Sequence, residues 1–106
     1  MRIFVDECVD WRLARDIVGH EVKTARQMGW TTLRNGELLA LTSKHFDVFV
    51  TVDRNLSFQQ NLPIVEIAVV VLRSRSNRLG DLQRLVPDLL ASLAAVKRGV
   101  VTYVGV

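Results

Sequence analysis

Residues 66–72 read Glu-Ile-Ala-Val-Val-Val-Leu, and every position after the glutamate is apolar. A strand with one face in water alternates apolar and polar residues, whereas a parallel strand covered on both faces is a nearly continuous apolar run. The stretch therefore predicts a parallel strand that is buried on both faces.

Strand patterns and helix patterns alternate on either side of this segment. The other strands are expected at residues 1–5, 20–25, 47–52 and 100–104. Strands that alternate with helices indicate an α/β fold, in which a mainly parallel central sheet of four to five strands is flanked by helices. The chain has 106 residues, the usual size of one domain, so residues 1–106 are expected to form a single domain.

Apolar side chains recur at helical spacing in three segments between the strands. Helices are therefore expected at residues 11–18, 36–45 and 79–96. Asp10 and Asn35 are suitable N-caps for the first two of these helices. Pro87 lies inside the third helix, which should kink there or restart with proline at its first position. Residues 26–34 should be a loop with at most one helical turn, and residues 54–63 are irregular or form a short helix.

The composition suits an ordinary globular protein, with 49% hydrophobic residues, 24% charged residues and a net charge of +3. No segment approaches the roughly 18 uninterrupted apolar residues of a membrane span, and the N-terminus lacks the apolar stretch of a secretory signal. A cytoplasmic location without membrane contact is expected. The single cysteine, Cys8, cannot form an internal disulfide, and we interpret it as a small buried apolar residue rather than a nucleophile.

Several acidic residues fall at the ends of predicted elements. Asp6 and Glu7 follow the first strand, Asp53 follows the third strand, and Glu37 lies in the first turn of the helix between them in sequence. A crossover helix begins at the edge where the preceding parallel strand ended, so all four acids should face the carboxyl edge of the sheet. Open α/β sheets bind ligands at that edge, in the crevice where the strand order reverses.

Crowded carboxylates repel one another unless one is protonated or a cation lies between them. Mg²⁺ and Mn²⁺ prefer such oxygen ligands, and a bound ion can stabilise a phosphodiester and activate a water molecule. We therefore predict a catalytic metal site formed by Asp6, Glu37 and Asp53, with Glu7 in support. Each acid taken alone could instead be a turn residue or a helix cap. A zinc site is not expected, because His20 and His45 lie at element ends away from this edge.

A basic loop follows the strand at residues 66–72. Arg73, Arg75 and Arg78 lie in this loop and Arg54 follows Asp53, so these guanidinium groups could contact the phosphates of RNA. The alternative is a solvated basic loop. The aromatic side chains that could stack on bases are Trp11, Trp30 and Phe58, although we expect Trp11 to pack in the core.

Three short motifs resemble the PIN-like proteins, compact relatives of the VapC-type toxin ribonucleases. They are Asp6-Glu7 after the first strand, Asn35-Gly-Glu37 at the start of a helix, and Thr51-Val-Asp53-Arg54-Asn55 after the third strand. Their order, together with Gly-His-Glu-Val and Met-Gly-Trp between them, extends the resemblance over nearly the whole chain.

The resemblance implies a three-layer PIN-like fold and a Mg²⁺- or Mn²⁺-dependent endoribonuclease. Asp6, Glu37 and Asp53 match the acidic ligands of the family, and Asn55 stands where PIN domains often have a further acid or polar residue. Metal affinity or activity could therefore be weak, although Glu7 could compensate. The resemblance also implies that the chain is the toxin of a toxin–antitoxin pair, with a small antitoxin as partner and a possible homodimer.

Two other functions fit part of this pattern. A receiver-like phosphoacceptor domain also has an acid pair after its first strand and an aspartate after its third. It requires in addition a hydroxyl after the fourth strand, for which Ser74 is available, and a lysine after the fifth, where the chain has none. The second alternative is a catalytically weak or inactive PIN-like module that binds a partner protein or RNA.

Overall fold

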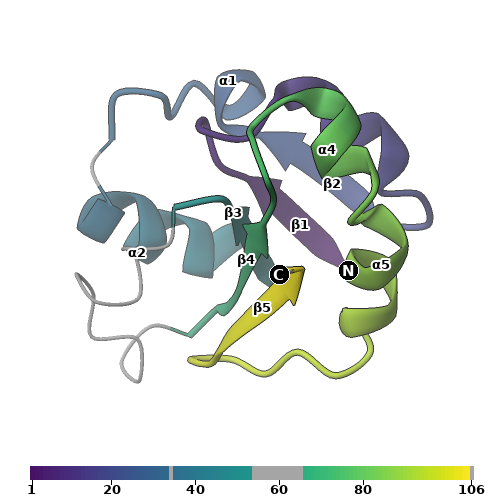
Figure 1. Cartoon of the computed structure of the whole chain (residues 1–106). Coiled ribbons are helices and arrows are strands. Elements are labelled where there is room, and N and C mark those ends of the chain that lie inside the picture. The colour runs from purple at the N-terminus through teal and green to yellow at the C-terminus, as the bar shows by residue number, and fades with distance from the viewer. Residues whose placement is uncertain (34, 54–65, 106) are drawn as a thin grey trace.

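The computed structural model describes residues 1–33, 35–53 and 66–105, which form an α/β fold (Figure 1). Its five strands are β1 (Arg2–Val5), β2 (Glu21–Thr24), β3 (Val48–Thr51), β4 (Ala68–Arg73) and β5 (Val101–Gly105). The helices of the described residues are the 3₁₀ helix η1 (Trp11–Asp16) and the α-helices α1 (Ala25–Met28), α2 (Asn35–His45), α4 (Leu79–Gln83) and α5 (Val86–Ser92).

The strands form one sheet in the order β2-β1-β3-β4-β5, and every neighbouring pair is parallel. Phe4 in β1 is in register with Lys23 of β2 on one side and with Phe49 of β3 on the other. The chain leaves β1 toward β2 and then crosses back to β3 on the opposite side, so the strand order reverses between β1 and β3. The prediction of a mainly parallel sheet is confirmed.

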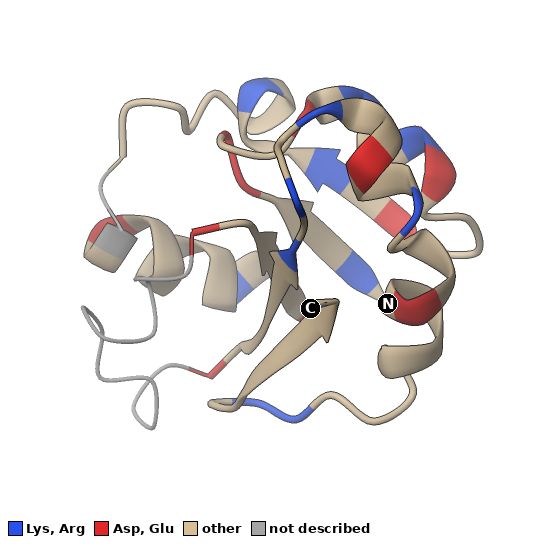
Figure 2. Ribbon diagram, viewed as in Figure 1, with Lys and Arg blue, Asp and Glu red and all other residues tan. Residues whose placement is uncertain are grey.

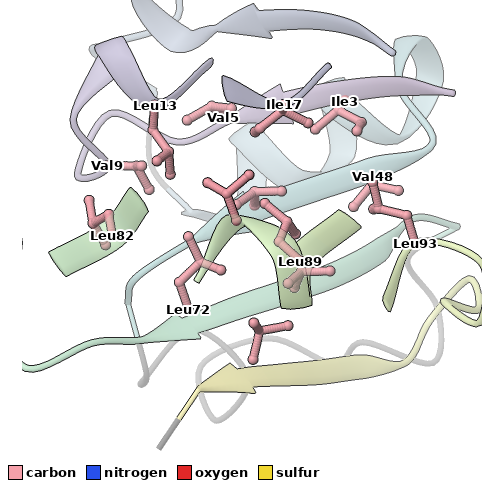
Figure 3. Packing of buried hydrophobic residues seen from close by; sticks show 14 of the residues in the cluster. Ile3, Val5, Val9, Leu13, Ile17, Val48, Leu72, Leu82, Leu89 and Leu93 are labelled. Carbon is pink, nitrogen blue, oxygen red and sulfur yellow. The ribbon is translucent and has the colours of Figure 1, made fainter. Parts of the chain in front are cut away.

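One face of the sheet carries an aliphatic core (Figure 3). Ile3, Val5, Val48 and Val50 point from β1 and β3 toward this core. Helices η1, α4 and α5 cover it, and they contribute Leu13, Leu82, Val86 and Leu89. Since successive side chains of a strand point to opposite faces, the residues between these positions build a second core.

The second core contains most of the buried aromatic side chains. Phe4 and Phe49 project from β1 and β3, and Leu38 and Leu39 of α2 cover them. The rings of Phe4 and Phe49 have centroids 5.4 Å apart, and Phe46 lies at the same distance from Phe4. Two cores on opposite faces give the three layers of helix, sheet and helix, and they explain why β4 is apolar at almost every position.

The helices follow the predicted pattern with two differences. The segment predicted as one helix over residues 79–96 is divided into α4 and α5, and Pro87 lies in the first turn of α5, so the predicted restart is confirmed. The helix predicted at residues 11–18 is the 3₁₀ helix η1, which ends at Asp16. The backbone N–H of Arg12 donates to the Asp10 carboxylate, which confirms Asp10 as the N-cap. Residues 54–63 lie within the range that the structure does not describe.

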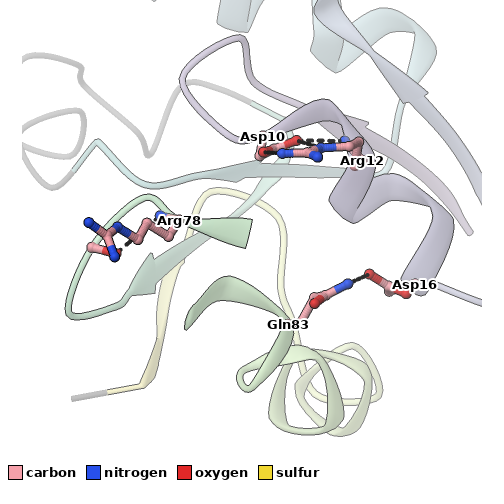
Figure 4. Close-up of polar contacts among 6 residues, drawn as sticks. Asp10, Arg12, Asp16, Arg78 and Gln83 are labelled. Carbon is pink, nitrogen blue, oxygen red and sulfur yellow. Dashed lines mark hydrogen bonds and ion pairs between the residues drawn. The ribbon is translucent and has the colours of Figure 1, made fainter. Parts of the chain in front are cut away.

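Several acids outside the sheet edge have structural roles. Asp47 accepts a hydrogen bond from the Arg2 backbone N–H at 2.8 Å. Asp16 accepts one from the Gln83 side-chain amide at 3.0 Å, which connects η1 to α4 (Figure 4). Asp81 accepts one from the Ser76 hydroxyl. No helix in the described part of the chain has the length and apolarity needed to cross a membrane.

Candidate functional site

Asp6 lies immediately after the carboxyl end of β1, and its backbone N–H donates to the Val50 carbonyl at 2.9 Å. This bond continues the pairing of β1 with β3 past the end of the strand. The Asp6 Oδ1 atom accepts a hydrogen bond from the Glu7 N–H at 2.8 Å, and Oδ2 accepts one from the Thr51 hydroxyl at 2.8 Å. The orientation of the carboxylate is therefore fixed by the turn that follows β1 and by the last residue of β3.

The Thr51 hydroxyl connects the two predicted aspartates. The Thr51 residue is completely buried, and its Oγ1 atom accepts a hydrogen bond from the Asp53 backbone N–H at 3.0 Å while it donates to Asp6. A single hydroxyl thus links the Asp6 carboxylate to the backbone that carries Asp53. The sequence prediction treated Thr51 as part of a strand and a motif and missed this role. A hydroxyl residue two positions before Asp53, at the end of a β-rich segment, is the signal that could have found it.

A pocket of about 530 Å³ opens beside this connection. Asp6, Glu7 and Asp53 line one part of it, and the side chains of Trp30, Leu33 and Leu38 form apolar walls. Three of the four acids expected at the carboxyl edge therefore share one pocket. Asp6 and Asp53 are half-buried, whereas Glu7 is exposed.

Glu37 lies at the start of α2, next in sequence to the pocket residue Leu38, and it is exposed. Within residues 1–33, 35–53 and 66–105, no three side chains of His, Cys, Asp or Glu are close enough together to hold a metal ion. The participation of Glu37 stays a prediction. Arg54 and Asn55 lie outside the described residues.

No protein-family model matches the chain. The curated proteins and the solved structures likewise give no significant match. The geometry of the sheet edge and the chemistry of its side chains are therefore the basis of the functional proposal below.

Cys8 contacts the same network, and its position corrects the sequence prediction. The residue is exposed rather than part of the core, because it lies in the turn after β1. Its Sγ atom is 3.3 Å from Asp6 Oδ2 and 3.3 Å from Thr51 Oγ1. Partial burial of the thiol, followed in importance by the negative charge of Asp6, raises the pKa of Cys8 above its ordinary value of 9.0.

Alkylation of Cys8 should report on the charge of Asp6. Only the thiolate reacts with iodoacetamide, so the pH midpoint of the reaction should lie above 9.0 in the wild type. Asp6→Asn should lower this midpoint, because the neutral amide removes the repulsion but leaves the burial unchanged. The chain has one cysteine, so mass spectrometry can follow the reaction without interference. A midpoint that is the same in both proteins would contradict the contact between Cys8 and Asp6.

The arginines of the loop after β4 have different surroundings. The Arg73 guanidinium donates to the Gly105 carbonyl at 3.3 Å, and its carbon Cζ is 4.8 Å from the centre of the Tyr103 ring, so this side chain is directed toward β5. Arg75 and Arg78 are exposed. Figure 2 shows basic segments on α1 and in the β4–α4 loop near the acidic turn that follows β1. Contact of the predicted arginines with RNA stays a prediction.

The structure also corrects the prediction for Trp11. Its side chain was expected in the core, but the residue is 46% exposed. The reason is the tighter turn of η1, in which Leu13 rather than Trp11 points into the core. Trp30 is half-buried and packs on Phe4 and Phe46. Phe58 lies outside the described residues.

Proposed function

We propose that this chain is a Mg²⁺- or Mn²⁺-dependent endoribonuclease of the PIN-like type. The observation that carries the proposal is the position of Asp6 and Asp53. They follow adjacent parallel strands at the point where the strand order reverses, they line one pocket, and the Thr51 hydroxyl links them. Ligands of open α/β sheets bind at this point.

The ligand that this proposal assigns to the two aspartates is a hard divalent cation. Mg²⁺ commonly uses one or two protein carboxylates and completes its coordination with water and substrate phosphate. Asp6 and Asp53 would provide the two carboxylates, and Glu7 in the same pocket could bind through water. Among the residues that the structure describes, the Asp6 Oδ1 atom accepts one hydrogen bond, from the Glu7 N–H, which leaves a lone pair for a ligand.

The side chains of the pocket have separate tasks in this proposal. A bound cation would stabilise the charge that develops on the phosphodiester and lower the pKa of the attacking water. The Thr51 hydroxyl holds the Asp6 carboxylate in one orientation. Trp30, Leu33 and Leu38 form the apolar walls of the pocket. Glu37 would approach from the start of α2.

A role as the toxin of a toxin–antitoxin pair, with an antitoxin partner or a homodimer, follows from the resemblance alone. A receiver-like domain has the same acidic positions at a β1–β3 crevice. The nuclease is the function we propose, because the three short motifs resemble the PIN-like proteins. Incubation with acetyl phosphate should leave Asp53 unmodified, and an acyl phosphate on this residue would favour the receiver.

The proposed function is tested by an RNA cleavage assay. Purified protein should cleave single-stranded RNA when Mn²⁺ or Mg²⁺ is present, and an excess of EDTA should stop the reaction. Added Mn²⁺ should then restore it, because the cation is part of the site. Cleavage that continues unchanged in EDTA would exclude a metal-dependent mechanism. RNA binding without cleavage at any metal concentration would favour the inactive binding module.

A further inference from the structure

A second recess continues from the acidic pocket along the surface of η1. One pocket of about 830 Å³ has Asp6, Glu7, Trp11 and Arg26 among the residues that line it. An adjoining pocket of about 490 Å³ is also lined by Trp11 and Arg26, and it reaches Arg15. Trp11 and Arg26 line both pockets, so the two pockets adjoin one another. Together they form a recess that extends from the proposed site to η1 and α1.

Trp11 is the main aromatic side chain in this recess. It is 46% exposed, and the Cζ atom of Arg15 lies 4.8 Å from the centre of its ring. An exposed indole that contacts an arginine is a suitable surface for a nucleic-acid base, because stacking and cation–π contact require a flat partner but no particular sequence.

The arginines that line the recess differ in whether they form an ion pair. The Arg12 guanidinium forms a bidentate interaction with the Asp10 carboxylate, in which Nε donates at 3.0 Å and Nη2 at 2.7 Å (Figure 4). These hydrogen bonds, with that of the Arg12 backbone N–H, lower the pKa of Asp10 to about 2, so Arg12 is paired with a carboxylate at neutral pH. Arg15 and Arg26 have no ion pair within the described residues. Their charges are therefore available to a polyanion.

We propose that this recess is the binding subsite for a single-stranded segment of nucleic acid, with one base stacked on Trp11 and phosphates near Arg15 and Arg26. A duplex does not fit this role, because its bases are already stacked and paired. The subsite rests on the proposed function in one respect: it would position the strand so that a neighbouring phosphodiester reaches Asp6.

The experiment measures binding without cleavage. Fluorescence anisotropy of a labelled single-stranded RNA in EDTA gives the Kd for wild type, Trp11→Leu and Tyr103→Leu. Tyr103 is a matched control, since it is 41% exposed and also lies 4.8 Å from an arginine Cζ atom, but it lines none of the pockets described above. We expect Trp11→Leu to weaken binding at least about fivefold, and Tyr103→Leu to change it by less than about twofold.

An RNA of the same length with abasic sites tests stacking without any variant. Wild type should bind this RNA at least about fivefold more weakly than the normal RNA, whereas Trp11→Leu should bind both equally. Arg15→Ala and Arg26→Ala should each reduce the slope of log K against log salt by about 0.7, because each loses one phosphate contact. These results do not depend on a metal, so they remain valid if the cleavage assay fails.

Four outcomes would overturn the inference. The first is equal loss of affinity in Trp11→Leu and Tyr103→Leu. The second is equal binding of abasic and normal RNA by wild type, which would show that the recess contacts phosphates alone or binds another anion, such as an acidic peptide. The third is tighter binding of duplex than of single-stranded RNA. Cleavage activity that survives in a Trp11→Leu protein of unchanged RNA affinity would reject the subsite and keep the proposed nuclease.

Discussion

Asp6→Asn and Asp53→Asn should each lower metal-dependent RNA cleavage by at least about 100-fold. Loss of a group that only orients a metal ligand commonly costs roughly 10–100-fold, and these residues would be the ligands themselves. An asparagine keeps the size of the side chain and can still accept the hydrogen bond from Thr51, so the fold around position 6 should be preserved. Cleavage is measured on single-stranded RNA at saturating Mn²⁺.

Asp16→Asn is the matched control for this comparison. Asp16 is also half-buried, but it lies on η1, where it accepts a hydrogen bond from Gln83 that an asparagine oxygen can also accept. Its activity should equal that of the wild type. Thermal unfolding of all three variants without metal should remain close to wild type, because none removes core volume. Equal activity in Asp6→Asn and Asp16→Asn would reject Asp6 as a catalytic ligand.

Thr51→Val should have the second largest effect, on both stability and metal affinity. Valine has nearly the same shape, but it cannot donate to Asp6 or accept from the Asp53 N–H. Since Thr51 is fully buried, the loss of these bonds should cost about 1–3 kcal/mol in the free energy of unfolding. The Asp6 carboxylate would also lose the contact that orients it, so metal affinity should fall by roughly 10–100-fold.

Thr51→Ser distinguishes the loss of the hydroxyl from the loss of side-chain packing. Serine keeps the hydroxyl but removes a buried methyl group, so it should lose some stability while its metal affinity remains within a few-fold of wild type. Urea unfolding gives the stability, and calorimetric titration with Mn²⁺ gives the affinity. Metal affinity that is equal in Thr51→Val and Thr51→Ser would exclude the hydroxyl as a positioning group for Asp6.

The sheet and the neighbouring positions of Asp6 and Asp53 could be predicted because they depend on simple geometry. The β-rich segment at residues 47–52 and the apolar run at residues 67–72 indicate parallel strands, and acids that follow such strands must lie at one edge. The order of β2 and β3 on either side of β1 then gives the crevice. The helix restart at Pro87 could likewise be predicted, because proline has no backbone N–H to donate within a helix.

Cys8 and Trp11 could not be predicted, because their environments depend on the turn and the 3₁₀ helix that follow β1. A helical spacing of 3.6 residues placed Trp11 on the buried face, but η1 has about three residues per turn and buries Leu13 instead. Cys8 was assigned by the general preference of cysteine for the interior, whereas it lies one residue past the acid pair in an exposed turn. Thr51 was missed because threonine is an ordinary strand residue and its hydroxyl has meaning only once β1 and β3 are paired.

The central claim is that Asp6 and Asp53 together hold a divalent cation at the carboxyl edge of the sheet. Titration of Mn²⁺ into wild type, Asp6→Asn, Asp53→Asn and Asp16→Asn, followed by the electron paramagnetic resonance signal of the free ion, measures this binding directly. The account predicts binding to wild type and Asp16→Asn, and at least about tenfold weaker binding to both of the other variants. Equal binding to all four proteins, or no binding to any of them, would contradict it.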